Sequence, residues 1–176
     1  MKTRTTNNSD KDKIKQVYLD AFPDAENKLV ANLAVDLLSE EFSPSVFSVV
    51  AENDNGIIAH IAFSPVTNLQ NHNLVAYILA PLAVRTDHQK EGIGSHLIRQ
   101  GLKQLSSTGI NTVLVYGDPK YYGRFGFSED LAKGFLPPCD LKFPHGWLGL
   151  TFNQANDQKL PIQLTCVEAL NNPVLW

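Results

Sequence analysis

Two closely spaced glycines, Gly92 and Gly94, mark the part of the chain that is best suited to chemistry. They belong to the run Gln89-Lys90-Glu91-Gly92-Ile93-Gly94-Ser95, which leads into a long amphipathic segment. A helix that begins there leaves backbone N–H groups without partners and carries partial positive charge at its first turn, so it stabilises an anion. The glycines remove side chains that would hold a phosphate away from the backbone, and the polar side chains of the run could add donors. The run therefore predicts a site for a phosphate or a pyrophosphate.

Two other interpretations of the spaced glycines have to be weighed. The pair could simply shape a tight entry to the helix, because glycine adopts conformations that other residues avoid. A dinucleotide site would need a third glycine where Leu97 stands and an acidic residue at the end of the following strand, near Val115. Both are missing, so the dinucleotide interpretation fails, and a purely structural helix entry remains the alternative.

The apolar segment before this run contains a proline, Pro81, within a predicted strand from Leu74 to Val84. Proline cannot donate to a sheet, so it marks a bulge, an interrupted pairing or an edge strand. If pairing is interrupted, the backbone groups of Leu82, Ala83 and Val84 are partly free. They could then pair with a ligand that carries amide groups, as though it were an added strand.

The first half of the chain predicts two helices followed by three antiparallel strands. The helices are Asp10 to Phe22, with Asp10 as N-cap, and a second one from Asp24 to a break at Ser43-Pro44. The strands are bounded by polar turns, and they are Val46–Glu52, Ile57–Val66 and Leu74–Val84.

The second half predicts a βαβ unit and a final hairpin. The amphipathic helix after Gly92 ends at Gly109, a residue suited to a left-handed C-cap. The strand Thr112 to Tyr116 follows, so it should run parallel to the strand before the helix. The remaining elements are a short helix at Tyr121–Phe125 and two strands, Trp147–Phe152 and Leu160–Glu168, separated by the loop Asn153–Lys159. The expected fold is a single α/β (α+β) domain over residues 1–176 with a mixed sheet of about six or seven strands, in the order ααβββ-α-β-α-ββ.

Composition narrows the function classes. The net charge of −3 and the pI of about 5.9 do not predict a general attraction to nucleic acid or to anionic lipid. No apolar run approaches the roughly 20 residues of a membrane span, and Met1 to Lys15 lacks the apolar core of a signal peptide, so a cytoplasmic protein is expected. Cys139 and Cys166 are too far apart for a CxxC motif, so no metal site is predicted. Cys166 is expected to be a small buried hydrophobic residue, and Cys139 to lie in an irregular segment.

Several of these features together resemble one enzyme superfamily. Leu82-Ala83-Val84 followed by Gln89-Lys90-Glu91-Gly92-Ile93-Gly94 is similar to the acetyl-CoA-binding motif Q/R-x-x-G-x-G/A of the GCN5-related N-acetyltransferases. The later segment from Tyr122 to Phe127 resembles their Y-x-x-x-G-F motif. Together with His60–Val66, the phrase Gly117–Phe127 resembles the YhbS-like subgroup more narrowly. The resemblance covers residues 10–127 well and the remainder in outline.

The resemblance implies a function and a set of roles. The backbone of Leu82, Ala83 and Val84 would pair with the pantetheine arm of acetyl-CoA, and the run from Gln89 to Ser95 would hold its pyrophosphate. A substrate amine would attack the acetyl carbonyl directly, and the N–H of Val84 could polarise that carbonyl. Tyr122 matches the tyrosine that protonates the departing sulfur, with Tyr121 as a competing candidate and packing against Phe125 and Phe127 as the structural alternative.

The resemblance leaves the base and the acceptor open. Many relatives carry a carboxylate on the strand before the proline, but Val75-Ala76-Tyr77-Ile78-Leu79 has none. A water chain, Tyr77 or a residue from the C-terminal part could serve, whereas His60 is more simply a structural residue. The acceptor, an amine of a small molecule or a protein, should meet the N-terminal helices, Ser64-Pro65-Val66 and the loops after Phe127. A CoA-binding module without catalysis, or an acyltransferase with another acyl group or nucleophile, is the alternative. An exposed edge among the last strands could pair two copies into a homodimer.

Overall fold

The computed structural model describes residues 1–39, 44–153 and 161–176. The chain forms two compact units, and each is assembled from separate stretches of sequence. Unit 1 comprises residues 1–63 and 80–103, and unit 2 comprises residues 64–79 and 104–176.

Unit 1 contains β1, β2, the first part of β3 and the last part of β4, and these strands are neighbours in that order. Their bounds are β1 Lys2–Thr5, β2 Phe47–Asn53, β3 Gly56–Asn68 and β4 Leu74–Val84. β1 pairs antiparallel with β2, and β2 pairs antiparallel with β3, from Phe47↔Phe63 to Asn53↔Gly56. The predicted β2–β3 hairpin is therefore confirmed, whereas β1 was not predicted, because its four polar residues carry no apolar alternation.

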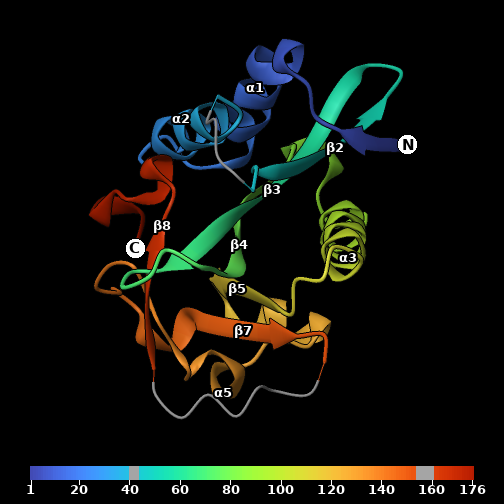
Figure 1. Ribbon diagram of the computed structural model, residues 1–176. Coiled ribbons are helices and arrows are strands. Elements are labelled where there is room, and N and C mark those ends of the chain that lie inside the picture. Colours follow the sequence, from blue (N-terminus) through green and yellow to red (C-terminus); the bar gives the residue numbers. More distant parts are fainter. Residues whose placement is uncertain (40–43, 154–160) are drawn as a thin grey trace. The chain divides into compact units, whose positions relative to one another are not determined.

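The helices of unit 1 cover both faces of this sheet (Figure 1). They are α1 Lys11–Ala21, α2 Asn27–Leu37 and α3 Ile93–Ser106. Tyr18 of α1 contacts His60 of β3. Phe63 of the same strand packs against Gly101 of α3, and it lies an odd number of residues after His60. Since successive strand residues point to opposite faces, α1 and α3 lie on opposite sides of β3.

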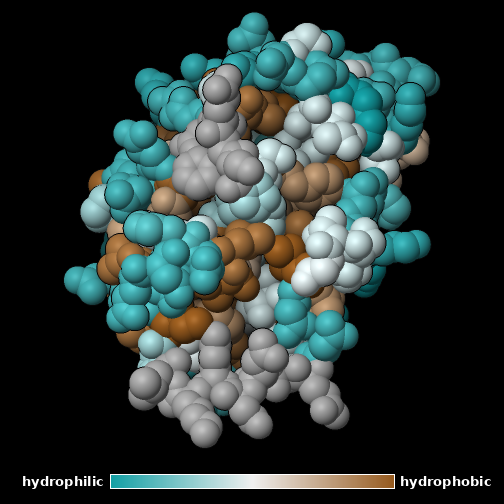
Figure 2. Space-filling view, in the orientation of Figure 1, coloured by the Kyte–Doolittle hydropathy of each residue, from teal (hydrophilic) through white to brown (hydrophobic). Residues whose placement is uncertain are grey.

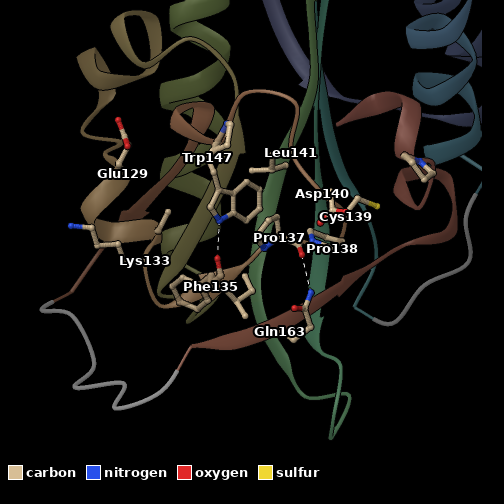
Figure 3. Close-up of a pocket in the computed structure, with 14 residues that line it drawn as sticks. Glu129, Lys133, Phe135, Pro137, Pro138, Cys139, Asp140, Leu141, Trp147 and Gln163 are labelled. Atoms are coloured by element: carbon tan, nitrogen blue, oxygen red, sulfur yellow. Dashed lines mark hydrogen bonds between the residues drawn. The ribbon is translucent and has the colours of Figure 1, made fainter.

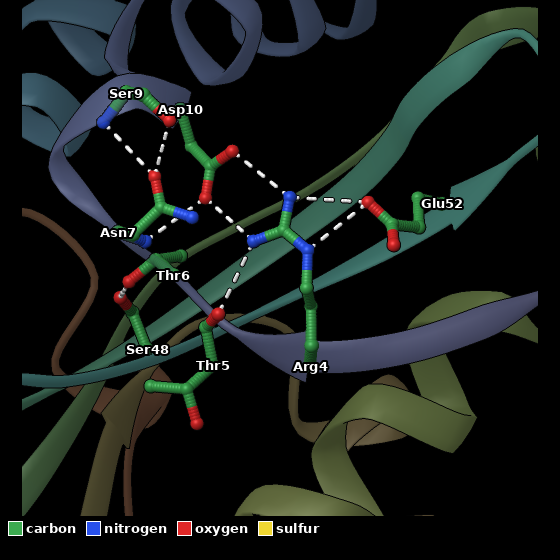
Figure 4. Close-up of polar contacts among 8 residues, drawn as sticks. All are labelled: Arg4, Thr5, Thr6, Asn7, Ser9, Asp10, Ser48 and Glu52. Carbon is green, nitrogen blue, oxygen red and sulfur yellow. Dashed lines mark hydrogen bonds and ion pairs between the residues drawn. The ribbon is translucent and has the colours of Figure 1, made fainter.

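Arg4 of β1 ties the strand to the start of α1 and to β2 (Figure 4). Its guanidinium donates to both carboxylate oxygens of buried Asp10, at 2.7 and 2.9 Å, and to Glu52 at 3.1 Å. This pairing lowers the pKa of Asp10. Asp10 occupies the N-cap position of α1, as predicted, but its side chain makes no cap bond to α1. It accepts instead the N–H of Asn7, and Asn7 caps the preceding 3₁₀ turn in a capping box.

Gly101→Ala is expected to destabilise the protein by about 1–3 kcal/mol. A helix interior normally gains about 1 kcal/mol when glycine becomes alanine. At this position the new Cβ would overlap the buried ring of Phe63, so overpacking reverses the sign. The measurement is the free energy of unfolding in urea.

The matched control for Gly101→Ala is the double variant Gly101→Ala/Phe63→Leu, which removes the obstructing ring. Its loss should be smaller than the sum of the two single losses. Strict additivity would show that the ring is not the cause.

Unit 2 places the last strands differently from the predicted hairpin. Its strands besides the ends of β3 and β4 are β5 Thr112–Tyr116, β6 Phe135–Leu136, β7 Trp147–Thr151 and β8 Ile162–Cys166. β4 runs parallel to β5, confirming the βαβ unit, and β7 pairs antiparallel with β5. β8 pairs with β3 and β6 instead of β7, so the β7–β8 hairpin was wrong. The hairpin was predicted because β7 and β8 are close in sequence. In the structure, β7 lies instead on the free side of β5, to which the segment from Ser128 to Gly146 leads.

The helices of unit 2 are short. They are α4 Pro119–Tyr122 and α5 Glu129–Ala132, with 3₁₀ turns at Gly123–Phe125, Pro144–Gly146, Glu168–Leu170 and Pro173–Leu175. The helical turn predicted at Tyr121–Phe125 is thus present, and α5 is an addition. Near the end of β5, Tyr116 stacks on Trp176 at 6.1 Å between ring centroids, and Trp147 contacts the same ring edge-on at 6.0 Å.

The mixed α/β sheet is confirmed, with eight strands among the described residues, of which β1 and β6 are additions to the six predicted strands. Gly109 has the expected left-handed backbone, with φ of 85°. α2 begins three residues later than predicted, and Cys166 is partly exposed, contrary to the prediction that it is buried. Three predicted features lie wholly or mostly outside the described residues: the break at Ser43, the strand residue Leu160 and the loop that precedes Leu160. In the described ranges, no helix is long and apolar enough to cross a membrane.

Candidate active site

The loop between β4 and α3, in unit 1, alternates in backbone handedness. Lys90 has φ of 66° and Gly92 has φ of 84°, whereas Glu91 between them keeps a negative φ. Residues of alternating hand turn their N–H groups toward one concave side, which is a common form of anion site. A left-handed lysine is strained, and such strain is typical of loops that bind ligands.

The start of α3 adds three further donors to this loop. The first hydrogen bond of the helix runs from the N–H of His96 to the carbonyl of Gly92, at 2.9 Å. The N–H groups of Ile93, Gly94 and Ser95 come before that bond and have no hydrogen-bond partner among the residues that the structure describes. Since α3 has 14 residues, its first turn carries a well-developed partial positive charge.

Space for a ligand exists next to these donors. A pocket of about 500 Å³ opens beside the start of α3, and Gly92, Ile93 and His96 form part of its wall. A Cβ built on Gly92 meets no atom within 4 Å. The backbone at this position is therefore open to a bulky anion, and the residues present fit a pyrophosphate group.

Side chains fix the loop at both ends. The amide Nε2 of Gln89 donates to the carbonyl of Val84 at 3.1 Å. Thr86 donates through its N–H and its hydroxyl to Asp20 of α1, at 2.7 and 3.0 Å. Gln89, which the sequence predicts as a donor to phosphate, thus uses one amide proton to close the loop.

The strand before the loop is β4, which contains a cis Ala80–Pro81 peptide bond. Beyond the proline, Leu82 and Val84 are half-buried and Ala83 is buried. The parallel pairing of β4 with β5 comprises Tyr77↔Val113 and Ile78↔Leu114, and the three predicted cofactor-binding residues lie beyond it. On its other side, the chain continues to pair with β3 through the N–H of Arg85 and the carbonyl of Ile58, at 2.9 Å.

Tyr122, in unit 2, lies against a glycine and a phenylalanine. A Cβ on Gly117 would lie 2.5 Å from the Tyr122 ring, so glycine is needed there. Phe127 contacts the ring edge-on at 5.9 Å between centroids, whereas Phe125 packs on Tyr121. The Tyr122 hydroxyl makes no hydrogen bond within the described residues, so it is available to a ligand.

Burial, and next the neighbouring Tyr121, raise the pKa of the Tyr122 phenol above its ordinary value. The phenol therefore stays protonated throughout the physiological range, which is the state an acid needs. Tyr121 is constrained differently, because the guanidinium of Arg124 covers its ring at 4.4 Å from the centroid.

His60 is a structural residue in this fold. It is fully buried in unit 1, and its Nδ1 lies 2.8 Å from the hydroxyl of Tyr18. Its Nε2 is buried without a partner among the described residues. Burial lowers the pKa of His60 to about 3, so the ring is neutral.

Acidification below pH 6.5 is expected to destabilise the protein through His60. The unfolded chain binds a proton there while the folded chain does not, so stability is complete above the ordinary pKa and falls toward the folded pKa of about 3. One such proton gives a slope of up to about 1.4 kcal/mol per pH unit. The check is the free energy of unfolding in urea between pH 6 and pH 4.5.

His60→Asn keeps a partner for Tyr18 but does not titrate, so its slope in this window should be lower by about 1 kcal/mol per pH unit. Asp10, whose folded pKa is lowered, loses its contribution only as the pH falls below its ordinary value of 3.8, outside the window. Tyr18→Phe is the control that retains the titrating ring. Equal slopes in wild type and His60→Asn would contradict the assignment.

A second pocket, of about 810 Å³, lies within unit 2 (Figure 3). Nine of its lining residues are apolar or proline, and five are polar. The first group is Ala132, Phe135, Leu136, Pro137, Pro138, Leu141, Pro144, Trp147 and Pro173, and the second is Glu129, Lys133, Cys139, Asp140 and Gln163. Hydrophobic side chains also reach the surface around β7 (Figure 2), and two large exposed ones, Leu136 and Phe143, belong to this part of the chain. The sequence located the acceptor loops after Phe127 only in outline, although the prolines at positions 137, 138 and 144 hint at a shaped irregular segment.

Among the described residues, no cluster of His, Cys, Asp or Glu is able to hold a metal ion.

The loop, the helix start and the tyrosine segment all lie in the part of the chain that a known family model matches. A family model described as an acetyltransferase (GNAT) domain matches residues 2–129. The chain therefore belongs to the GNAT acetyltransferases, as the sequence motifs predict.

Two relatives from Escherichia coli strain K12 are similar in sequence. The uncharacterized N-acetyltransferase YjhQ is 33% identical over 142 residues, which cover 80% of this chain and 77% of YjhQ. The uncharacterized N-acetyltransferase YhbS is 38% identical over 105 residues, or 59% of each chain.

Two crystal structures of GNAT proteins share the fold. E. coli YhbS in complex with CoA superposes with a TM-score of 0.80 at 26% identity, covering 97% of this chain and 92% of YhbS. A GNAT acetyltransferase from Brucella melitensis in complex with acetyl-CoA gives a TM-score of 0.73 at 29% identity, covering 96% of both chains.

Proposed function

We propose that this protein transfers the acetyl group of acetyl-CoA to a primary amine, of a small molecule or of a protein, by direct attack. The observation that carries the proposal is the alternating loop at Lys90 and Gly92, followed directly by the unpaired donors of α3. The complexes of YhbS and of the Brucella protein with CoA and acetyl-CoA support it. In this proposal residues 1–176 act as one acetyltransferase domain.

The chain's own groups have distinct tasks in binding. The N–H groups of the run Gln89 to Ser95 would hold the pyrophosphate, with the dipole of α3 adding to them. The backbone of Leu82, Ala83 and Val84 would pair with the pantetheine amides, and the Val84 N–H would lie at the acyl oxygen. Bound acetyl-CoA supplies an activated acyl group with a thiolate as leaving group.

Tyr122 would donate the proton that the leaving sulfur needs. An ordinary phenol has a pKa near 10 and a thiol one near 8.5, so in water this transfer is uphill by about 2 kcal/mol. Burial raises the pKa of both groups, because each ionises to an anion, and a sulfur that leaves into a buried site is more basic than in water. Tyr122 can therefore act as the acid despite its raised pKa.

The amine must lose a proton before it attacks, and neither Tyr77 nor His60 is suited to accept it. Burial raises the pKa of Tyr77, which keeps this phenol neutral and unsuited to accept a proton. His60 is buried and engaged with Tyr18. We therefore assign this proton to water.

The test of the proposed function is the release of free CoA from acetyl-CoA with a panel of amines, together with calorimetric binding of CoA. Turnover that depends on the amine supports the proposal. Tight CoA binding without turnover on any amine would favour a CoA-binding module instead.

A further inference from the structure

The pocket of unit 2 and Tyr122 lie at the same end of β5. Trp147, in the pocket wall, pairs with Tyr116, the last residue of β5. The next residue, Gly117, donates its N–H to the carbonyl of Gly146 at 2.9 Å. The ring of Tyr122 packs on Gly117. The consecutive residues Tyr116 and Gly117 therefore connect the pocket wall with the tyrosine.

The pocket and the tyrosine segment lie on opposite faces of the β5–β7 ladder. Trp147 and Gly149 share one face, and the backbone of Leu131 covers Gly149 there, because a Cβ on this glycine would lie 2.8 Å from it. Leu150 points to the other face, where a Cβ on Gly126 would lie 3.6 Å from its Cδ1. In transfer from a thioester, the nucleophile attacks carbon while the acid protonates sulfur. These two atoms are bonded to each other, so an acceptor in the pocket has to reach the end of β5 from the face opposite to the tyrosine segment.

The walls of the pocket select an apolar body. The indole N–H of Trp147 already donates to the carbonyl of Phe135 at 2.8 Å, so the ring offers only its apolar surface. The amide of Gln163 is likewise bound to the carbonyl of Pro137 at 2.8 Å. A volume of about 810 Å³ is ample for a small molecule that contains a ring.

The charges of the pocket select a cation. Glu129 is within 3.1 Å of His145, and Lys133 pairs with Asp130. Asp140 forms no ion pair with any described residue, and its side chain is exposed at the pocket. Asp140 is therefore the carboxylate that is available to an ammonium group.

We propose that this pocket binds the acceptor, a cationic primary amine with an apolar, ring-sized body, and that Asp140 pairs with its ammonium group. This inference rests on the proposed function and names its substrate class. One N–C bond forms and one C–S bond breaks; the ammonium group loses two protons to water, one before the attack and one as the amide forms, while the sulfur takes one proton from Tyr122, which regains one from water.

The first experiment measures binding without turnover. 2-Phenylethylamine and ethylamine are titrated into the protein with CoA bound, by calorimetry and by tryptophan fluorescence. Both tryptophans of the chain, Trp147 and Trp176, belong to the cluster at this pocket, so their emission reports on it. The ring should strengthen binding at least about tenfold, because it removes apolar area from water.

The second experiment measures Asp140→Asn against the matched control Asp54→Asn, which removes the same charge from an exposed turn of unit 1. Asp140→Asn should raise the KM for 2-phenylethylamine about tenfold and leave the KM for acetyl-CoA unchanged. The control should change neither. Leu136→Ser, at an exposed wall position, should weaken the preference for the ring.

Equal affinity for the two amines, or equal effects of Asp140→Asn and Asp54→Asn, would overturn the inference. Selective binding of 2-phenylethylamine without release of CoA would support the pocket assignment and overturn the proposed function instead. A dimer that covers the pocket and binds no amine would overturn the inference in favour of a second copy as the occupant.

Discussion

Gly92→Asp is expected to weaken the binding of CoA by at least about 100-fold, or about 2.7 kcal/mol. The new carboxylate would stand in the open space where the pyrophosphate is proposed to lie, and like charges at that distance repel strongly. The Kd from calorimetric titration with CoA is the measurement. The new Cβ meets no atom within 4 Å, so the cost to the fold is limited to the backbone strain of a side chain at φ of 84°.

Two controls separate the charge from the backbone in this experiment. Gly92→Asn has nearly the same size and the same cost at φ of 84° but no charge, so it should lose much less affinity. Gly109→Asp places a carboxylate at a comparable φ of 85° after the other end of α3, and it should bind CoA as wild type does. Equal Kd values for the Asp and Asn variants at position 92 would argue against a phosphate at this loop.

Tyr122→Phe is expected to lower kcat about 100-fold, with little change in the KM for acetyl-CoA. The substitution keeps the ring that packs on Gly117 and Phe127 and removes only the hydroxyl, so the fold should be unaffected. Because burial raises the pKa of Tyr122, the wild type should show no alkaline loss of activity from this residue below pH 10. The measurement is the initial rate of CoA release across pH 6 to 10.

Tyr121→Phe is the matched control for the acid, since it removes a hydroxyl from the adjacent residue. It should leave kcat within about threefold of wild type. Unchanged turnover in Tyr122→Phe would remove this residue from the mechanism, and a larger loss in Tyr121→Phe would transfer the role to Tyr121.

The sequence predicts the parts of the fold that depend on local pattern. The strand Leu74–Val84 and the strand Thr112–Tyr116 agree with the structure at both ends. They are long or strongly apolar, and glycine or polar turns delimit them. The left-handed backbone at Gly109 was also predicted, from a glycine at the end of a helical pattern.

Features that depend on distant partners could not be predicted. β1 exists because Arg4 finds Asp10 and Glu52, which are 6 and 48 residues away along the chain. Asp10 has the residue type of an N-cap, yet the guanidinium of Arg4 is a stronger partner than a helix N–H. The separation of β7 from β8 depends on which strand edge is free, and no local pattern records that.

The candidate site likewise has one part that local sequence predicts and one part that depends on distant partners. The loop from Gln89 to Ser95 is local, so its donors could be inferred from two glycines and a helix start. The pocket of unit 2 combines Phe135, Trp147 and Gln163, from three different strands. Its existence depends on the pairing of β6 with β8, which only the structure gives.

The division into two units has a consequence for attempts to dissect the protein. The chain crosses between the units three times, at residues 63/64, 79/80 and 103/104, and each crossing falls inside a regular element: β3, β4 or α3. No single cut yields either unit as a continuous fragment, and unravelling one unit would pull at strands whose hydrogen bonds belong to the other. We therefore expect one cooperative unfolding transition, and limited proteolysis that trims loops without releasing a stable half.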